Sequence, residues 1–110
     1  MQTIQTVQEL ETLARTHDLL LVYFSGETCG VCRSLLPKVE KMLEAYPQIA
    51  SARVEVGQAP ELAASRQIFS VPAILLLIQG KETIRESGVL SLQALEQRIA
   101  RYYALFYSNP

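Results

Sequence analysis

The sequence of 110 residues has no tryptophan, one histidine and only two cysteines. A structural zinc site takes about four ligands, usually cysteine or histidine, so Cys29, Cys32 and His17 cannot complete one within a single chain. A site shared by two chains, with one cysteine pair from each, stays open as a weaker alternative. We interpret His17 as a solvated residue of the RTHDLL connection and predict no metal site.

Clusters of basic residues and long apolar runs are also missing. Ten Lys and Arg against eleven Asp and Glu give a formal net charge of −1. Phosphate binding needs clustered cations, so we expect no nucleic-acid partner. The longest apolar runs are LLLVYF and VPAILLLI, both far short of the ~20 residues that cross a bilayer. We therefore expect no membrane segment.

The first residues lack the basic start and the apolar stretch of a secretory signal. For that reason we expect a cytoplasmic protein. In this reducing compartment, a CxxC pair is more often catalytic or metal-binding than a structural disulfide.

No internal repeat, low-complexity tract or linker is found in residues 1–110, and 49% of them are hydrophobic. This composition predicts a single domain with its own core. The first helix is expected to bury a stripe from Ile4 to Ala14, with Thr6 and Glu9 as a capping box. Further helices are expected over residues 29–46, 59–67 and 92–106, and strands over 19–24, 51–56, 71–78 and 82–87.

Strands that alternate with helices and then form a hairpin predict an α/β fold. We expect a mixed sheet of about four strands, covered by helices on both faces. The expected order of elements is α-β-α-β-α-β-β-α.

Both cysteines lie in SGETCGVCRSLLP, residues 25–37, where a predicted strand is followed by a helix. Cys29 is expected at the start of that helix, where unpaired N–H groups and the helix dipole stabilise a thiolate, the reactive form. Cys32 lies on the same side of the first turn and can close a small disulfide ring. This context indicates redox chemistry. The alternative is a pair of incidental buried thiols, which the polar turn before Cys29 disfavours.

Over nearly its whole length the sequence resembles the thioredoxin family. The family pattern is a strand, a CxxC pair that opens a kinked helix, a cis-proline before a later strand, and a glycine before the last helix. The matching segments here are LLLVYF, CGVC, Pro37, SVPAILLL with Pro72, and SGVLSLQAL with Gly88. The resemblance implies a three-layer thioredoxin-like fold and a thiol–disulfide oxidoreductase.

The resemblance also implies a role for individual residues. Cys29 would attack a substrate disulfide, and Cys32 would resolve the mixed disulfide. Pro72 matches the cis-proline, Val71 would offer its backbone to an extended substrate, and Gly88 would line the same groove. No cofactor is needed, because the dithiol carries the two electrons. The implied partners are protein disulfides and a flavin-containing thioredoxin reductase or another dithiol donor.

Two departures from the family pattern affect the substrate-binding surface. Thr28 replaces the usual tryptophan, and Val31 replaces the usual proline between the cysteines. We expect a smaller and more polar docking surface, together with a more oxidising reduction potential. Val31, Val71 and Phe69 could form an apolar patch around Cys29, although we favour Phe69 as a core residue.

A third departure concerns proton transfer. Tyr23 stands where the family has a buried aspartate, and Arg53 matches a nearby lysine. Tyrosine is no base near neutral pH, because its usual pKa is ~10. We favour Tyr23 as a core aromatic, with a hydrogen bond to the Cys32 sulfur as the alternative. Glu27 and Glu55 are the other carboxylates that could take the proton, and the sequence does not choose between them.

Aromatic residues crowd the C-terminal RYYALFYSNP. We expect two of Tyr102, Tyr103, Phe106 and Tyr107 to point inward and two to lie at the surface. The alternative is an association surface, so the chain is expected to be a monomer or a weak homodimer.

Three functions fit these observations. The leading one is a cytosolic thiol–disulfide oxidoreductase that works through a reversible Cys29–Cys32 disulfide. The second is a non-catalytic thioredoxin-like adaptor or redox sensor, which the missing tryptophan and aspartate slightly favour. The third is a metal or persulfide carrier that uses the same CxxC pair.

Overall fold

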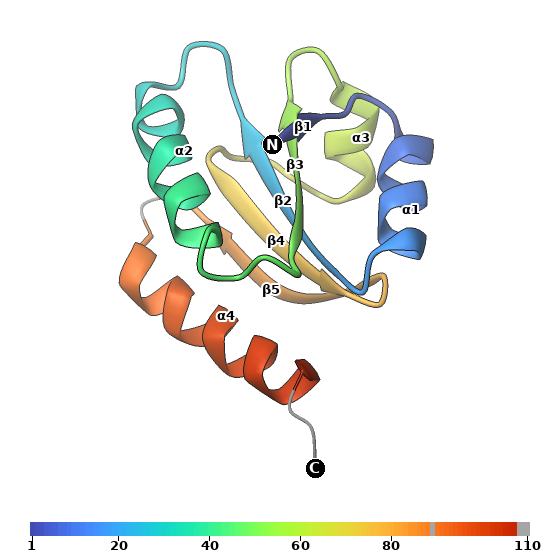
Figure 1. The fold of residues 1–110 in the computed structure, drawn as a ribbon. Coiled ribbons are helices and arrows are strands. Elements are labelled where there is room, and N and C mark those ends of the chain that lie inside the picture. The colour runs from blue at the N-terminus through green and yellow to red at the C-terminus, as the bar shows by residue number, and fades with distance from the viewer. Residues whose placement is uncertain (89, 108–110) are drawn as a thin grey trace.

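Strands alternate with helices along most of the chain in the computed structural model, which describes residues 1–88 and 90–107. Five strands and four helices lie in these ranges (Figure 1). In chain order they are β1 (Gln2–Thr3), α1 (Val7–Thr16), β2 (Leu19–Ser25), α2 (Gly30–Leu43), β3 (Ala50–Glu55), α3 (Pro60–Ser65), β4 (Ala73–Ile78), β5 (Lys81–Ser87) and α4 (Leu92–Tyr107).

The strands form one mixed sheet in the order β1-β3-β2-β4-β5. Strands β1, β3 and β2 run parallel, while β4 is antiparallel to both β2 and β5. The α/β fold expected from the sequence is confirmed, with one strand more than expected. That strand, β1, has two residues, too few for an alternating pattern to reveal it.

Ile4 is not part of the first helix, so that part of the prediction is wrong. Its N–H donates a hydrogen bond of 2.9 Å to the Arg53 carbonyl, and its side chain is fully buried. The helix begins after Thr6, which forms the predicted capping box with Glu9. Ile4 fits the apolar stripe because it enters the same core cluster as Leu10 of α1.

Each face of the sheet carries a layer of helices. Successive side chains of a strand point to opposite faces, and in β2 Leu20 joins the core on the α1 and α3 side, whereas Leu21 joins the core on the α2 and α4 side. Figure 1 shows these two helix pairs on opposite sides of the sheet. Because β2 is buried over its whole length, its sequence is apolar throughout rather than alternating.

Helix α2 ends at Leu43, earlier than the predicted end at Tyr46. Residues 44–46 continue as turns in which each N–H donates to the carbonyl three residues before it. Pro37 lies inside α2 and has no N–H for the Arg33 carbonyl, which is why proline bends a helix. The ends of β2 to β5, α3 and α4 differ from the predicted ones by at most two residues.

The C-terminal aromatic residues pack on the α2 and α4 side of the sheet. Tyr102, Tyr103, Phe106 and Tyr107 are all partly buried there, rather than two inward and two at the surface as expected. The rings of Tyr103 and Tyr46 lie 5.2 Å apart in an edge-to-face arrangement. This contact joins α4 to the segment that follows α2. A tyrosine ring can be partly buried in this way while its hydroxyl group remains accessible to solvent.

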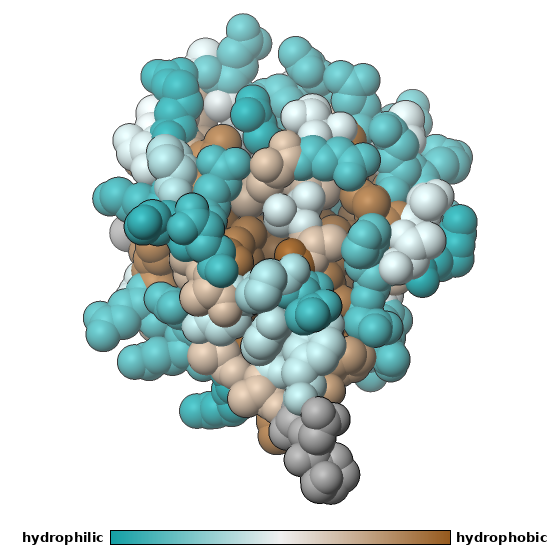
Figure 2. Space-filling view, in the orientation of Figure 1, coloured by the Kyte–Doolittle hydropathy of each residue, from teal (hydrophilic) through white to brown (hydrophobic). Residues whose placement is uncertain are grey.

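Hydrophilic side chains surround the margin of the face seen in Figure 2, and hydrophobic ones lie toward its centre. The helices thus turn their polar sides outward, as amphipathic helices on a sheet do. Within residues 1–88 and 90–107, no helix has the length and apolar character needed to cross a membrane.

Candidate active site

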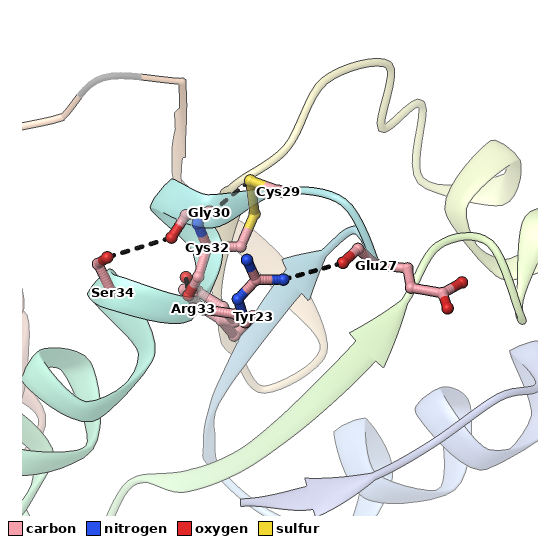
Figure 3. The surroundings of a disulfide bond; sticks show 7 residues. All are labelled: Tyr23, Glu27, Cys29, Gly30, Cys32, Arg33 and Ser34. Atoms are coloured by element: carbon pink, nitrogen blue, oxygen red, sulfur yellow. Dashed lines mark hydrogen bonds between the residues drawn. A yellow bond between two sulfur atoms is a disulfide. The ribbon is translucent and has the colours of Figure 1, made fainter.

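The two cysteines lie where β2 passes through a short loop into α2. Cys29 is the N-cap residue of α2, and its Sγ accepts a hydrogen bond of 3.1 Å from the Cys32 N–H. Its own N–H donates to the Gly26 carbonyl at 3.1 Å, which closes the loop. Figure 3 shows the sulfur atoms at the start of the helix. The predicted position of Cys29 at the helix N-terminus is confirmed.

A disulfide joins Cys29 and Cys32, whose Cα atoms are 5.3 Å apart. The two residues differ in exposure: Cys29 is half-buried, whereas only 1% of Cys32 is exposed. A substrate that approaches from solvent can therefore reach the Cys29 sulfur first. The free N–H groups of the helix start also favour negative charge on that sulfur.

A second segment, just before β4, comes up against this loop. The Val71–Pro72 peptide bond is cis. Gly26 lies so close to this segment that a Cβ on it would be 3.2 Å from Val71 Cγ2 and 3.8 Å from Cys29 Cβ. A larger residue at position 26 would push Val71 away from Cys29. The sequence alone did not single out Gly26, although a glycine between a buried strand and a CxxC pair was a signal.

Gly88 lies beside the same segment. Its N–H donates to the Pro72 carbonyl at 2.9 Å, and its φ of 71° is one that glycine adopts without strain. The structure thus brings together Cys29, Val71, Pro72 and Gly88, as the resemblance implied. These residues come from three separate parts of the chain.

Thr28 and Val31 are exposed beside the cysteines, and 57% of Val31 is accessible. Phe69 is also exposed, at 89%, so the prediction of a core position for it is wrong. The preceding residue, Ile68, takes the core position instead, with its N–H bonded to the Ala63 carbonyl at 3.0 Å. The side chain of Phe69 therefore projects into solvent.

Tyr23 is fully buried below the disulfide. Its hydroxyl donates a hydrogen bond of 2.7 Å to the backbone carbonyl of Cys32, not to the sulfur. Burial raises the pKa of Tyr23 above its ordinary value, while the charge of Arg53 partly offsets this. The interpretation of Tyr23 as a core aromatic is confirmed, and its hydroxyl serves to hold the first turn of α2.

The structure separates the two carboxylates that the sequence left open. Glu27 is exposed, and Figure 3 shows its carboxylate directed away from the disulfide. Its backbone carbonyl accepts a hydrogen bond of 3.2 Å from Arg33. Glu55, on β3, lines a cavity of about 450 Å³ together with Cys32 and Arg53, and one of its carboxylate oxygens is buried, whereas Glu27 stands at the rim of that cavity. His17 is exposed at the end of α1, outside this site.

Comparisons with known proteins agree with this geometry. The thioredoxin family model matches residues 2–101. Thioredoxin-like protein YdfQ of Bacillus subtilis (strain 168) is 29% identical over 106 residues, which cover 96% of this chain and 95% of that protein. Thioredoxin-1 of Saccharomyces cerevisiae is 29% identical over 96 residues, which cover 87% of this chain and 92% of that protein.

Solved structures give the same result. The thioredoxin of Fasciola hepatica is 32% identical and superposes with a TM-score of 0.83, covering 92% of this chain and 98% of that one. A thioredoxin mutant from Halobacterium salinarum NRC-1 is 27% identical with a TM-score of 0.84, covering 93% and 89%. Given this match and the cysteine pair at the start of α2, the chain belongs to the thioredoxin family of thiol–disulfide oxidoreductases.

Proposed function

We propose that this protein exchanges disulfides with protein substrates, with Cys29 as the nucleophile and Cys32 as the resolving cysteine. The observation that carries the proposal is the difference between the two sulfurs. Cys29 is the more exposed, and its Sγ accepts the Cys32 N–H at the start of α2. Such a hydrogen bond stabilises the thiolate that attacks a substrate disulfide.

The substrate would lie along the segment before β4. In the described part of the chain, the backbone of Val71 forms no hydrogen bond with another segment, so its N–H and carbonyl can pair with an extended peptide. Gly88 is hydrogen-bonded to Pro72, the next residue, and Thr28 and Val31 are exposed beside the cysteines. A protein disulfide carried on an extended strand fits this arrangement.

We propose that the protein works in the cytoplasm as a monomer or weak homodimer and that a thioredoxin reductase or another dithiol returns it to the reduced state. The exchange itself needs no cofactor, because two thiols become one disulfide and supply two electrons. The N–H group that donates to Cys29 Sγ is that of Cys32, not that of Val31. A reduction potential more oxidising than that of a typical thioredoxin, expected from Val31 in place of proline, therefore stays a prediction.

The first experiment is a titration of the Cys29–Cys32 pair against a thiol buffer, with free thiols counted by a mass tag. A reduction potential near roughly −270 mV supports a disulfide reductase, and one near about −180 to −120 mV supports an isomerase or an oxidant. If no disulfide forms at any buffer composition, the exchange proposal is wrong, and an adaptor or carrier role replaces it.

A pair of matched variants tests the two cysteine roles. Cys32→Ser is expected to accumulate a mixed disulfide through Cys29, because no thiol remains to resolve it. Cys29→Ser is expected to form none, since Cys32 is buried. Mass spectrometry after mixing each reduced variant with a disulfide-bonded peptide reads out the adduct. Equal adducts in both variants would contradict the assignment.

A further inference from the structure

Two buried side-chain atoms have no hydrogen-bond partner among the described residues: Arg53 Nε and Glu55 Oε1. An unpartnered polar atom in the interior is costly, so each one calls for an explanation. Both residues lie on β3, two positions apart, and therefore point to the same face of the sheet. Their neighbours Ala52 and Val54 face the α1 and α3 core, so Arg53 and Glu55 face α2.

The face toward α2 is where the redox pair lies. Arg53, Glu55 and Cys32 line one cavity of about 450 Å³, bounded by the end of β2, the loop before Cys29 and the first turns of α2. One water needs only about 10–15 Å³ of such space. Several waters can therefore connect the Glu55 carboxylate with Cys32, of which only 1% is exposed.

The other charged groups around this cavity are paired or directed elsewhere. Arg33 donates to the backbone carbonyl of Glu27 at 3.2 Å, and the Glu27 carboxylate is exposed and directed away from the disulfide (Figure 3). Glu40 pairs with the N-terminal ammonium of Met1 at 3.2 Å. Arg53 is a cation and cannot accept a proton.

Tyr23 is the titratable group that faces the cavity region from β2. It lies directly across from Arg53 in the sheet. Its hydroxyl already donates to the Cys32 carbonyl, and burial raises its pKa, so it does not accept a proton near neutral pH. Of the carboxylates that line the cavity, those of Glu27, Glu40 and Glu55, only Glu55 has a buried oxygen without a partner among the described residues.

We propose that Glu55, with Arg53 beside it, takes the proton from the Cys32 thiol through cavity water when the mixed disulfide is resolved. This proposal rests on the assignment of Cys29 and Cys32 made above. It places the proton acceptor on β3, one strand away from Tyr23, which occupies the position that an acidic residue holds in the family pattern.

The Cys32 thiol loses its proton to the Glu55 carboxylate by way of water, and the resulting thiolate attacks Cys29 Sγ. The bond between Cys29 and the substrate sulfur breaks, the Cys29–Cys32 disulfide forms, and the substrate leaves as a thiolate. Two electrons pass from the protein dithiol to the substrate. The proton on Glu55 then returns to solvent or to the departing thiolate.

The test follows the two steps separately in the full-length reduced protein. Dithiobis(nitrobenzoate) releases one coloured thiolate when Cys29 attacks and a second when Cys32 resolves the adduct. The first phase speeds up with reagent concentration in stopped flow, whereas the second, intramolecular phase does not. The variants are Glu55→Gln and, as the matched control, Glu27→Gln, which removes a carboxylate from the rim of the same cavity.

Glu55→Gln is expected to slow the second phase at pH 7 by about tenfold or more, since positioned acid–base groups contribute on the order of 10²–10⁴-fold. The first phase stays unchanged. The second phase recovers as the pH rises, because hydroxide then removes the Cys32 proton. Glu27→Gln leaves both phases as they are in the unmodified protein.

A normal second phase in Glu55→Gln would overturn the proposal, and so would an equal loss in Glu27→Gln. Should Glu55→Gln not fold, as judged by circular dichroism, Glu55→Asp replaces it: the second phase alone must slow, while Glu27→Asp changes neither. Failure of the exchange assignment itself looks different. The unmodified protein would then show no second phase that depends on Cys32.

Discussion

At the residue scale, Tyr23 shows how one substitution changes the task of a position. The tyrosine hydroxyl donates to the Cys32 backbone carbonyl at 2.7 Å and makes no hydrogen bond to the sulfur. Its ring also fills the core beside Leu21 and Ile74. The residue contributes stability to the first turn of α2, and proton transfer must use another group.

We expect Tyr23→Phe to lower the free energy of unfolding by about 1–2 kcal/mol, because a buried carbonyl loses its donor while the apolar packing remains. The pH dependence of mixed-disulfide resolution should not change, since the hydroxyl does not carry the proton. Urea denaturation followed by circular dichroism measures the first quantity, and stopped-flow exchange measures the second.

Tyr46→Phe is the matched control. The Tyr46 hydroxyl donates to Glu96 at 3.1 Å in a partly exposed pair, where water can replace it, so a change within about 0.5 kcal/mol is expected. Equal losses in the two variants, or a shifted pH profile in Tyr23→Phe, would contradict the structural role of the buried hydroxyl.

At the scale of elements, α1 and α2 begin in the same way. In each helix a side-chain atom of the N-cap residue accepts the N–H three positions on: Thr6 Oγ1 from Glu9, and Cys29 Sγ from Cys32. In α1 this arrangement stabilises the helix. In α2 it places a reactive sulfur at the positive end of the helix dipole.

Thr6→Ala is expected to cost about 1 kcal/mol of unfolding free energy, the usual effect of losing an N-cap side chain. Thr12→Ala makes the same chemical change at an exposed position inside α1, where alanine is the better helix former. That control should be neutral or slightly stabilising. Urea titrations measure the unfolding free energy of both variants. Equal destabilisation would show that loss of the N-cap hydrogen bond is not the cause of the change in Thr6→Ala.

The capping box also predicts an acid limit. The hydrogen bonds from the N–H groups of Gln5 and Thr6 and from the Thr6 hydroxyl lower the pKa of Glu9 below 4.5. Its stabilising effect is therefore present above pH 4.5 and is lost as the pH falls through the lowered pKa. In Thr6→Ala part of this pH dependence should disappear, which stability curves between neutral and acidic pH can show.

At the scale of the whole molecule, aromatic residues on the α2 and α4 side of the sheet form a connected cluster. Tyr46 contacts Tyr103, Tyr103 contacts Tyr107, and Tyr107 contacts Phe106, with ring centroids 4.9 to 5.2 Å apart. Burial raises the pKa of Tyr46 and of Tyr107, with nearby Glu96 and Asp18 adding to the effect. Burial does the same for Tyr23.

These raised pKa values predict loss of stability in alkali. Below the ordinary tyrosine pKa of 10.0 both the folded and the unfolded chain hold the phenolic protons, and the contribution is fully present. Above it the unfolded chain loses them first, so the free energy of unfolding falls as the pH rises through the folded-state values. Urea titrations between pH 8 and 11, with phenolate absorbance as a second signal, measure this fall.

Tyr46→Phe should flatten part of the alkaline decline, because one of the shifted groups is removed. An unchanged stability across the alkaline range would contradict the raised pKa values of these tyrosines.

The sequence by itself determined the chemistry and most of the elements. The CxxC pair, its place between an apolar strand and a helix, Pro37 and the Thr6–Glu9 capping box are local patterns, and local patterns report backbone structure within a few turns. The position of Cys29 at the start of α2 followed from them. The two-residue strand β1 and the end of α2 could not be predicted from local patterns. The first depends on pairing with β3, and the second on the hydrogen bonds of the turns that follow Leu43.

Only the tertiary structure decided which residues from distant segments meet. Ile68 takes the core position and leaves Phe69 exposed, and the pairing of β2 with β3 sets Tyr23 opposite Arg53. The same pairing turns Glu55 toward α2 and into the cavity of Cys32. The sequence of a strand shows which residues share a face of the sheet. Which helices cover that face depends on the packing of the whole chain, and no single segment contains that information.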